Sequence, residues 1–165
     1  MSTPISVRNR SSKPALKNPP ILIKKTQRVI QQIESKLHER LITYWNSPNG
    51  SICDNDVIGL YGILRSIGRT EKLSFFIKSD GGSGQVALRM VHLLRRFVGR
   101  LKVLVPLECQ SAATMLALGA DQIRMGPLAH LSAVDTSLTH DLSPIDRDND
   151  RVSVSQDELH RVVRL

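Results

Sequence analysis

Strand-like runs and helical patterns alternate along the middle of this chain of 165 residues. The runs rich in β-branched, aliphatic and aromatic residues span 41–45, 73–77 and 101–105, and a short fourth run follows at 122–125. Between them, apolar residues recur at the spacing of amphipathic helices. Strands that alternate with helices at this distance form βαβ units, which build a parallel sheet with right-handed crossovers. The sequence therefore predicts an α/β fold with a mostly parallel sheet.

The predicted helices differ in how much of their surface is apolar. Amphipathic patterns cover 26–39 and 86–97, and another helix stops near Gly68. Residues 111–120 are instead apolar on every side, which is typical of a helix buried in the core. We therefore expect this last helix inside the domain and the amphipathic ones at its surface.

The two ends of the chain differ from its middle. Residues 1–20 show no apolar periodicity and are predicted to be an arm, so that the domain itself spans 21–165. The polar, aspartate-rich stretch 135–153 is predicted to be a loop. Ser155 followed by Glu158 is a capping box, which predicts a helix to the end of the chain. Because that helix would be cut off after about three turns, we expect the natural fold to continue beyond it.

The net charge of +8 comes mostly from the arm and the residues just after it. Seven Lys and Arg precede Glu34 with no acidic residue among them, whereas basic and acidic residues nearly balance later in the chain. Such an arm is usually solvated, and weak contact with an anionic membrane or nucleic acid is the alternative. With two cysteines, no signal peptide and no apolar run of about 20 residues, we expect a cytoplasmic protein that could associate with membranes.

Two loops follow strand ends and would meet at one edge of a parallel sheet. The first, 79–82, contains the glycine pair Gly81 and Gly82, which permits positive φ and N–H groups that point outward. The second, 108–111, ends at Ser111, where the buried helix starts. Alone, a glycine pair is most often a tight turn and a serine a helix cap. Together the two loops are more specific than either one.

Residues 27–135 resemble the serine dehydrogenase proteinase family, a branch of the Clp-type protease and crotonase superfamily that also contains the signal-peptide peptidases. The resemblance rests on four segments in the same order and covers about two-thirds of the chain: 75–82, 103–106, 111–123 and 133–135. It implies a ClpP/crotonase-like spiral of βαβ units. It also implies a serine peptidase that acts on a peptide or protein substrate, as a homo-oligomer.

The resemblance assigns roles to the residues of the two loops. Ser111 is implied as the nucleophile that attacks the scissile carbonyl. Gly81, Gly82 and Ala112 are implied as the donors of the oxyanion hole. Relatives usually have proline where this chain has Asp80, and glycines where it has Ala112 and the residue after it. These departures would narrow the space around the serine.

The base that must activate Ser111 is the open part of this prediction, because an unassisted serine hydroxyl is a weak nucleophile. Clp-type proteases place a histidine near the position of Asp135, and signal-peptide peptidases use a lysine, but no lysine follows Lys102. The candidates are Asp135 by position and His130 or His140 by chemistry.

Three alternatives to this peptidase remain open. The chain could be an inactive oligomeric scaffold that lost its base, or it could carry crotonase-like acyl-CoA chemistry, which needs the same oxyanion geometry without Ser111. Cys109 could also be the nucleophile, although a cysteine just before a helix is more often a small buried hydrophobe. Metal-ligand spacing, a phosphate-binding loop and a dinucleotide fingerprint are absent, so we expect no cofactor and no metal.

Overall fold

Strands and helices alternate in the structure in the order that the sequence predicts. The computed structural model describes residues 24–47, 50–134, 137–138, 143, 145, 147, 152 and 154–155. Its elements are α1 (Lys24–Leu37), β1 (Arg40–Trp45), α2 (Asp54–Ile67), β2 (Thr70–Lys78), α3 (Gly84–Phe97), β3 (Val98–Val105), β4 (Glu108–Cys109), α4 (Ala112–Leu118), β5 (Gln122–Met125), β6 (His130–Leu131), β7 (Ser137–Leu138) and β8 (Val154–Ser155).

The central sheet has four strands in the order β1-β2-β3-β5, and every neighbouring pair is parallel. This confirms the predicted mostly parallel α/β fold. One row across the sheet joins Ile42, Phe75, Val103 and Ile123 in register. Residues in register on parallel strands point to the same face, and the first three of these are buried. These side chains therefore form the part of the hydrophobic core that the sheet contributes.

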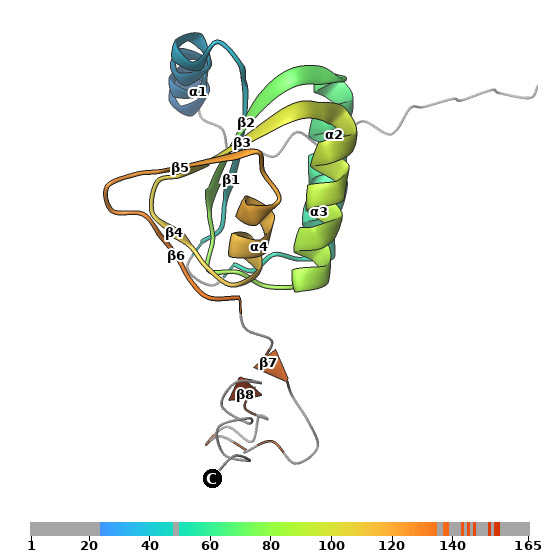
Figure 1. Cartoon of the computed structure of the whole chain (residues 1–165), viewed down its shortest axis with the longest axis vertical. Coiled ribbons are helices and arrows are strands. Elements are labelled where there is room, and N and C mark those ends of the chain that lie inside the picture. The colour runs from blue at the N-terminus through green and yellow to red at the C-terminus, as the bar shows by residue number, and fades with distance from the viewer. Residues whose placement is uncertain are drawn as a thin grey trace, which may run out of the picture.

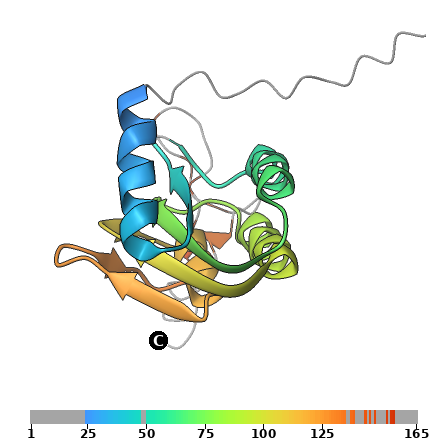
Figure 2. The ribbon, with the colours of Figure 1, turned by 90° about the horizontal axis from the view of Figure 1, so that it is seen from above.

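Helices α2 and α3 lie side by side on one face of the sheet, and α1 lies on the other (Figures 1 and 2). The short helix α4 packs against α3. Helices α2, α3 and α4 each bury large apolar side chains in the core: Leu60, Leu64, Met90, Leu94 and Leu116. Full burial of one such side chain contributes about 1.5–3 kcal/mol. The hydrophobic core therefore lies between the sheet and helices α2, α3 and α4. The all-round apolar sequence of α4 agrees with its place there.

Helix α3 uses its apolar side inside the domain. Val86, Ala87, Met90 and Leu94 are all buried. These four side chains face the core, whereas Leu88 of the same helix is 49% exposed. Self-association through this helix or through the terminal helix stays a prediction.

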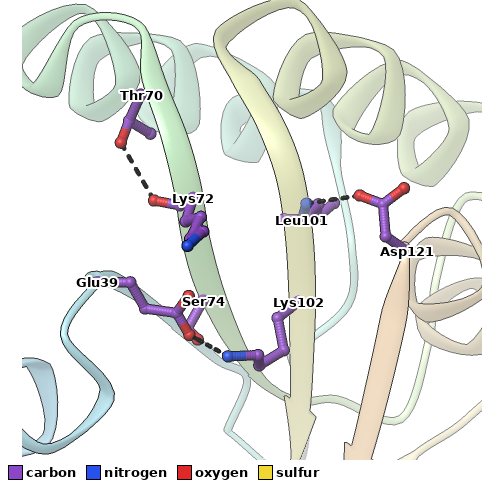
Figure 3. A network of polar contacts seen from close by, with 7 residues as sticks. All are labelled: Glu39, Thr70, Lys72, Ser74, Leu101, Lys102 and Asp121. Carbon is purple, nitrogen blue, oxygen red and sulfur yellow. Dashed lines mark hydrogen bonds and ion pairs between the residues drawn. The ribbon is translucent and has the colours of Figure 1, made fainter.

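Helix α1 has no fully buried residue, although Ile30, Ile33 and Leu37 are half-buried, and polar side chains add contacts between this segment and the sheet. Glu34 accepts a hydrogen bond from the Leu41 N–H at 3.0 Å. Just after the helix, the Glu39 carboxylate accepts hydrogen bonds from Ser74 Oγ at 2.6 Å and from Lys102 Nζ (Figure 3). Burial alone would raise the pKa of Glu39, but these two hydrogen bonds and the positive charges of Lys102 and Arg124 together hold the pKa below its usual value.

Several boundaries differ from the predicted ones. Strands β2 and β3 begin three residues early, at Thr70 and Val98, because these two residues pair with each other and satisfy their backbone groups in the ladder. The two-residue strand β4 lies in the stretch 108–111 that the sequence predicts to be a loop, and it pairs in parallel with β6. Leu118 in α4 is 63% exposed, although its neighbours in the helix are largely buried.

Among the described residues of the predicted loop 135–153, Ser137–Leu138 form strand β7, which pairs antiparallel with β8. Ser155 therefore belongs to a strand, and the helix predicted to follow it lies outside the described residues, as does the arm 1–20. None of the helices in the described part of the chain combines the length and the apolar character that a bilayer-spanning segment needs.

Candidate active site

The two loops that the sequence singles out lie side by side. Beyond the end of β2, Ser79 forms a parallel bridge with Cys109 of β4. Its N–H donates to Glu108 O at 3.0 Å, and its carbonyl accepts from the Gln110 N–H at 2.9 Å. These bonds join the glycine loop to the turn that carries Ser111.

Ser111 lies between β4 and α4 with φ 49° and ψ −120°. Positive φ is uncommon for a residue with a side chain, and such a conformation costs about 1–3 kcal/mol. The residue occupies the N-cap position of α4, but its side chain makes no capping hydrogen bond. The ordinary helix-cap interpretation therefore does not describe this serine. Strained strand-to-helix turns of this kind hold serine nucleophiles in α/β-hydrolases.

The glycine pair allows the backbone to pass between the Ser111 turn and Ile52. Gly81 has φ 109° and Gly82 has φ 138°. A Cβ on Gly81 would lie 2.8 Å from the Cβ of Ser111, and a Cβ on Gly82 would lie 2.3 Å from the Ile52 nitrogen. On the Ile52 side, the Ile52 N–H donates to Gly81 O at 2.8 Å. Neither position has room for a side chain, so the pair is required by close approach on both sides.

The backbone N–H groups around Ser111 differ in whether they are occupied. The Gly81 N–H donates to Ser79 Oγ at 3.2 Å. The N–H groups of Gly82 and Ala112 have no hydrogen-bond acceptor among the described residues. Ala112 N also lies 3.4 Å from the Cβ position of Gly81, so the glycine loop and the start of α4 are in contact.

The structure does not bring a base to Ser111 within its described residues: no side chain there forms a hydrogen bond with the Ser111 hydroxyl. His130 lies on β6 opposite Glu108, and its exposed ring nitrogen Nε2 is 3.2 Å from Nε2 of Gln110. Asp135 and His140 lie outside the described residues. The identity of the base therefore stays a prediction.

Ser132 is a site residue that the sequence does not single out. The Ser111 N–H donates a hydrogen bond to Ser132 Oγ at 2.7 Å. The contact depends on the pairing of β4 with β6, two strands too short to have a recognisable sequence pattern. Knowledge of the β4–β6 register would have been needed to identify Ser132 as a site residue.

Cys109 is fully buried, and burial raises the pKa of its thiol to about 11. The thiol is therefore protonated at neutral pH and has little nucleophilic character. This confirms the interpretation of Cys109 as a small buried hydrophobe rather than an alternative nucleophile. Its carbonyl accepts a hydrogen bond from Thr114 Oγ1 at 2.7 Å, which fixes the start of α4.

A charged group lies beside the glycine loop. Lys78 Nζ is 3.8 Å from a carboxylate oxygen of Asp80 and 3.8 Å from one of Glu108. Asp80, at the position where relatives of the resembling family have proline, is thus one of two carboxylates that share a single lysine. Within the described residues, no group of three or more His, Cys, Asp or Glu side chains could hold a metal ion.

No family model and no curated protein matches this sequence. Solved structures do match. A lysine-to-alanine mutant of the 1510-N membrane-bound stomatin-specific protease, in complex with a substrate peptide, has a TM-score of 0.53 at 15% identity, over 75% of this chain and 55% of that one. A serine-to-alanine mutant of the same protease also gives 0.53, at 14% identity, over 75% and 58% of the two chains.

The ClpP1 protease from Listeria monocytogenes also matches, with a TM-score of 0.45 at 19% identity, over 61% of this chain and 58% of that one. The chain thus spans little more than half the length of these structures. Identity at this level speaks for the fold alone. This chain shares the α/β fold of the 1510-N protease, in agreement with the ClpP-like fold that its sequence resemblance implies.

Proposed function

We propose that this chain is a serine peptidase domain of the ClpP-like type, with Ser111 as its nucleophile. The observation that carries the proposal is the strained turn at Ser111, whose hydroxyl caps no helix and whose Cβ faces a glycine with no room for a side chain. Strained backbone at a residue with a side chain is concentrated at functional sites, and the Ser111 hydroxyl itself makes no hydrogen bond that would explain the conformation as a helix cap.

The oxyanion hole is proposed to consist of the Gly82 and Ala112 N–H groups, both without an acceptor among the described residues. Ala112 is buried, and a backbone N–H at a buried residue rarely stays unpaired, which supports a bound acceptor at this position. Gly81 contributes space rather than a donor, because its own N–H is bonded to Ser79. Two such donors would stabilise the negative oxygen of a tetrahedral intermediate.

In the proposed reaction, Ser111 Oγ attacks the peptide carbonyl and its proton passes to a base, which then protonates the leaving amine. Asp135 and His140 are the proposed candidates for this base. His130 is the alternative within the described residues, since it touches Gln110 next to the nucleophile. Water then releases the acyl group by the same steps in reverse order.

The proposed substrate is a peptide or protein, and the 1510-N match is itself a complex with a substrate peptide. We also propose that the chain works as a homo-oligomer, because neighbouring subunits would enclose a site built from shallow loops. The basic arm 1–20 is proposed to be solvated, with at most weak contact with anionic surfaces.

A second candidate function is an inactive scaffold that keeps the fold without its base. The observation that favours it is the lack of any described side chain bonded to the Ser111 hydroxyl. Labelling with a fluorophosphonate separates the two functions. The peptidase predicts labelling of the wild-type chain and none of Ser111→Ala. Labelling of both proteins would identify another nucleophile, and labelling of neither would favour the scaffold.

A further inference from the structure

Ser132 meets the nucleophile turn from a strand far along the sequence. Strand β6 pairs with β4 in parallel, with Leu131 opposite Cys109. The ladder continues one residue further, because the Ser132 N–H donates to Cys109 O at 3.4 Å. This register places the Ser132 side chain beside the backbone of Ser111.

The Ser132 hydroxyl acts as an acceptor toward Ser111. Its oxygen accepts the Ser111 N–H at 2.7 Å, while its own O–H donates to the carbonyl of Ala133 at 3.0 Å. The hydroxyl hydrogen is therefore directed away from Ser111, which leaves an oxygen lone pair for the N–H. As a consequence, the Ser111 N–H is not available to a substrate oxygen.

This contact acts on the strained residue itself. A non-glycine residue keeps a positive φ only when its surroundings hold it there. On one side of Ser111, the turn is tied to the glycine loop by the Gln110 N–H and Ser79 O. On the other side, the Ser111 carbonyl accepts the Met115 N–H at 3.2 Å, within the first turn of α4. The peptide unit between Gln110 and Ser111 is held at both ends, because the Gln110 carbonyl accepts the Ala113 N–H at 2.9 Å and the Ser111 N–H donates to Ser132. The Ser132 side chain is the only one among the described residues that bonds the Ser111 backbone.

We propose that Ser132 is a positioning residue, which holds Ser111 in the conformation from which its hydroxyl attacks and reserves the oxyanion site for the N–H groups of Gly82 and Ala112. The inference rests on the proposed peptidase function, because positioning has a meaning only for a reactive Ser111. It adds the prediction that the Ser132 hydroxyl, just after β6, controls the reactivity of a nucleophile that it does not deprotonate.

The test compares Ser132→Ala with Ser132→Thr, which keeps the hydroxyl, and with Ser66→Ala as a matched control. Ser66 also uses its hydroxyl in one hydrogen bond, to Ile63 O at 2.7 Å, but it lies on α2 outside the site. Four quantities are measured in the full chain: the rate of fluorophosphonate labelling, kcat and KM for a peptide substrate, the melting temperature, and hydrogen exchange of the Ser111 amide.

We expect Ser132→Ala to slow labelling and lower kcat by roughly 10- to 100-fold, since a displaced nucleophile loses reactivity steeply. KM should stay the same, and the Ser111 amide should exchange faster. Ser132→Thr should restore both the rate and the protection, and Ser66→Ala should match the wild type. If Ser132→Ala folds poorly, Ser132→Cys makes the same comparison, because sulfur is a weak acceptor of similar size.

Two results would overturn the positioning role: a Ser111 amide that exchanges equally fast in the wild type and in Ser132→Ala, or faster exchange in Ser132→Ala with an unchanged labelling rate. Failure of the proposed function looks different, because the wild-type chain itself then stays unlabelled. In that case the proposed positioning role of Ser132 is also refuted, although amide exchange still reports the hydrogen bond between Ser111 and Ser132.

Discussion

Two serines in this molecule stand in opposite situations, one on the outer face of the sheet and one at its carboxyl-terminal edge. Ser74 is buried beside Lys102, and its hydroxyl donates to Glu39, which also accepts from Lys102 (Figure 3). Ser111 has strained backbone, and its hydroxyl has no partner among the described residues. The cluster around Ser74 contains a serine, a lysine and a carboxylate, but these groups hydrogen-bond to one another. The comparison teaches that residue types alone do not distinguish the two serines. The strained backbone and the hydroxyl without a hydrogen-bond partner are what single out Ser111 as the proposed nucleophile.

The most direct test of this comparison removes the hydroxyl of Ser111 and, separately, that of Ser74. We expect Ser111→Ala to abolish fluorophosphonate labelling, because the nucleophilic oxygen is gone. Its free energy of unfolding should change by less than about 0.5 kcal/mol, since no capping hydrogen bond is lost. Ser74→Ala should do the reverse and leave labelling intact while it destabilises the fold. Urea unfolding and a labelling assay on both variants measure these outcomes. A Ser111→Ala variant that loses as much stability as Ser74→Ala would show that Ser111 is structural.

A side chain at Gly82 tests the proposed site by steric displacement, without removing a reactive group. In Gly82→Val the new Cβ would lie 2.3 Å from the Ile52 nitrogen, so the backbone must move and take the Gly82 N–H with it. We expect the labelling rate to fall by about 10²–10³, the effect of losing one oxyanion donor. Gly59→Ala on α2 is the matched control, because a Cβ there meets nothing within 4 Å. An undiminished rate in Gly82→Val would exclude this N–H from the oxyanion hole.

The outer cluster should respond in stability alone. Lys102→Ala leaves the Glu39 carboxylate, which is 6% exposed, without its cation. Loss of one partner of a buried ion pair destabilises a protein by about 3–5 kcal/mol. The double variant Glu39→Gln with Lys102→Met, which removes both charges, should recover most of that loss. Labelling of the folded Lys102→Ala protein should equal that of the wild type, and a slower rate would show that the cluster supports the site.

The smallest expected effect is the pH dependence that Glu39 adds. Burial tends to raise its pKa, but the hydrogen bonds from Lys102 and Ser74, together with the positive charges of Lys102 and Arg124, hold the folded-state pKa below the usual 4.5. Its contribution to stability is therefore present above that usual value and is lost as the pH falls through it toward the folded-state pKa. Urea unfolding of the wild type between about pH 5 and pH 3 should show a steeper loss than unfolding of Glu39→Gln. Parallel curves would mean that the pair makes no net contribution.

Much of the fold could be predicted because its signals are local. Apolar runs mark β1, β2 and β3, and the all-round apolar sequence of α4 marks a buried helix. The glycine pair could be predicted as well, because glycine is the residue type that positive φ favours. These features depend on residues that are close together in the sequence.

The rest of the site depends on contacts between distant segments. Nothing in the residue type of Ser111 indicates its positive φ, which the surrounding hydrogen bonds impose. Strands β4 and β6 have two residues each, too few for an alternation to be visible, so neither their pairing nor Ser132 could be predicted. Asp135 and His140 lie outside the described residues. The choice of base among Asp135, His130 and His140 therefore stays a prediction from the sequence.

Among the helices of the described part of the chain, α1 alone has no fully buried residue. Its detachment would break the hydrogen bond between Glu34 and Leu41 and would expose only the half-buried side chains of Ile30, Ile33 and Leu37 on the helix itself. Its amide hydrogens should therefore exchange through a local opening, well before those of α3, whose release requires the core to unfold. Helix α1 would then behave as a separate folding unit, able to leave and return while the sheet, the glycine loop and the Ser111 turn stay assembled.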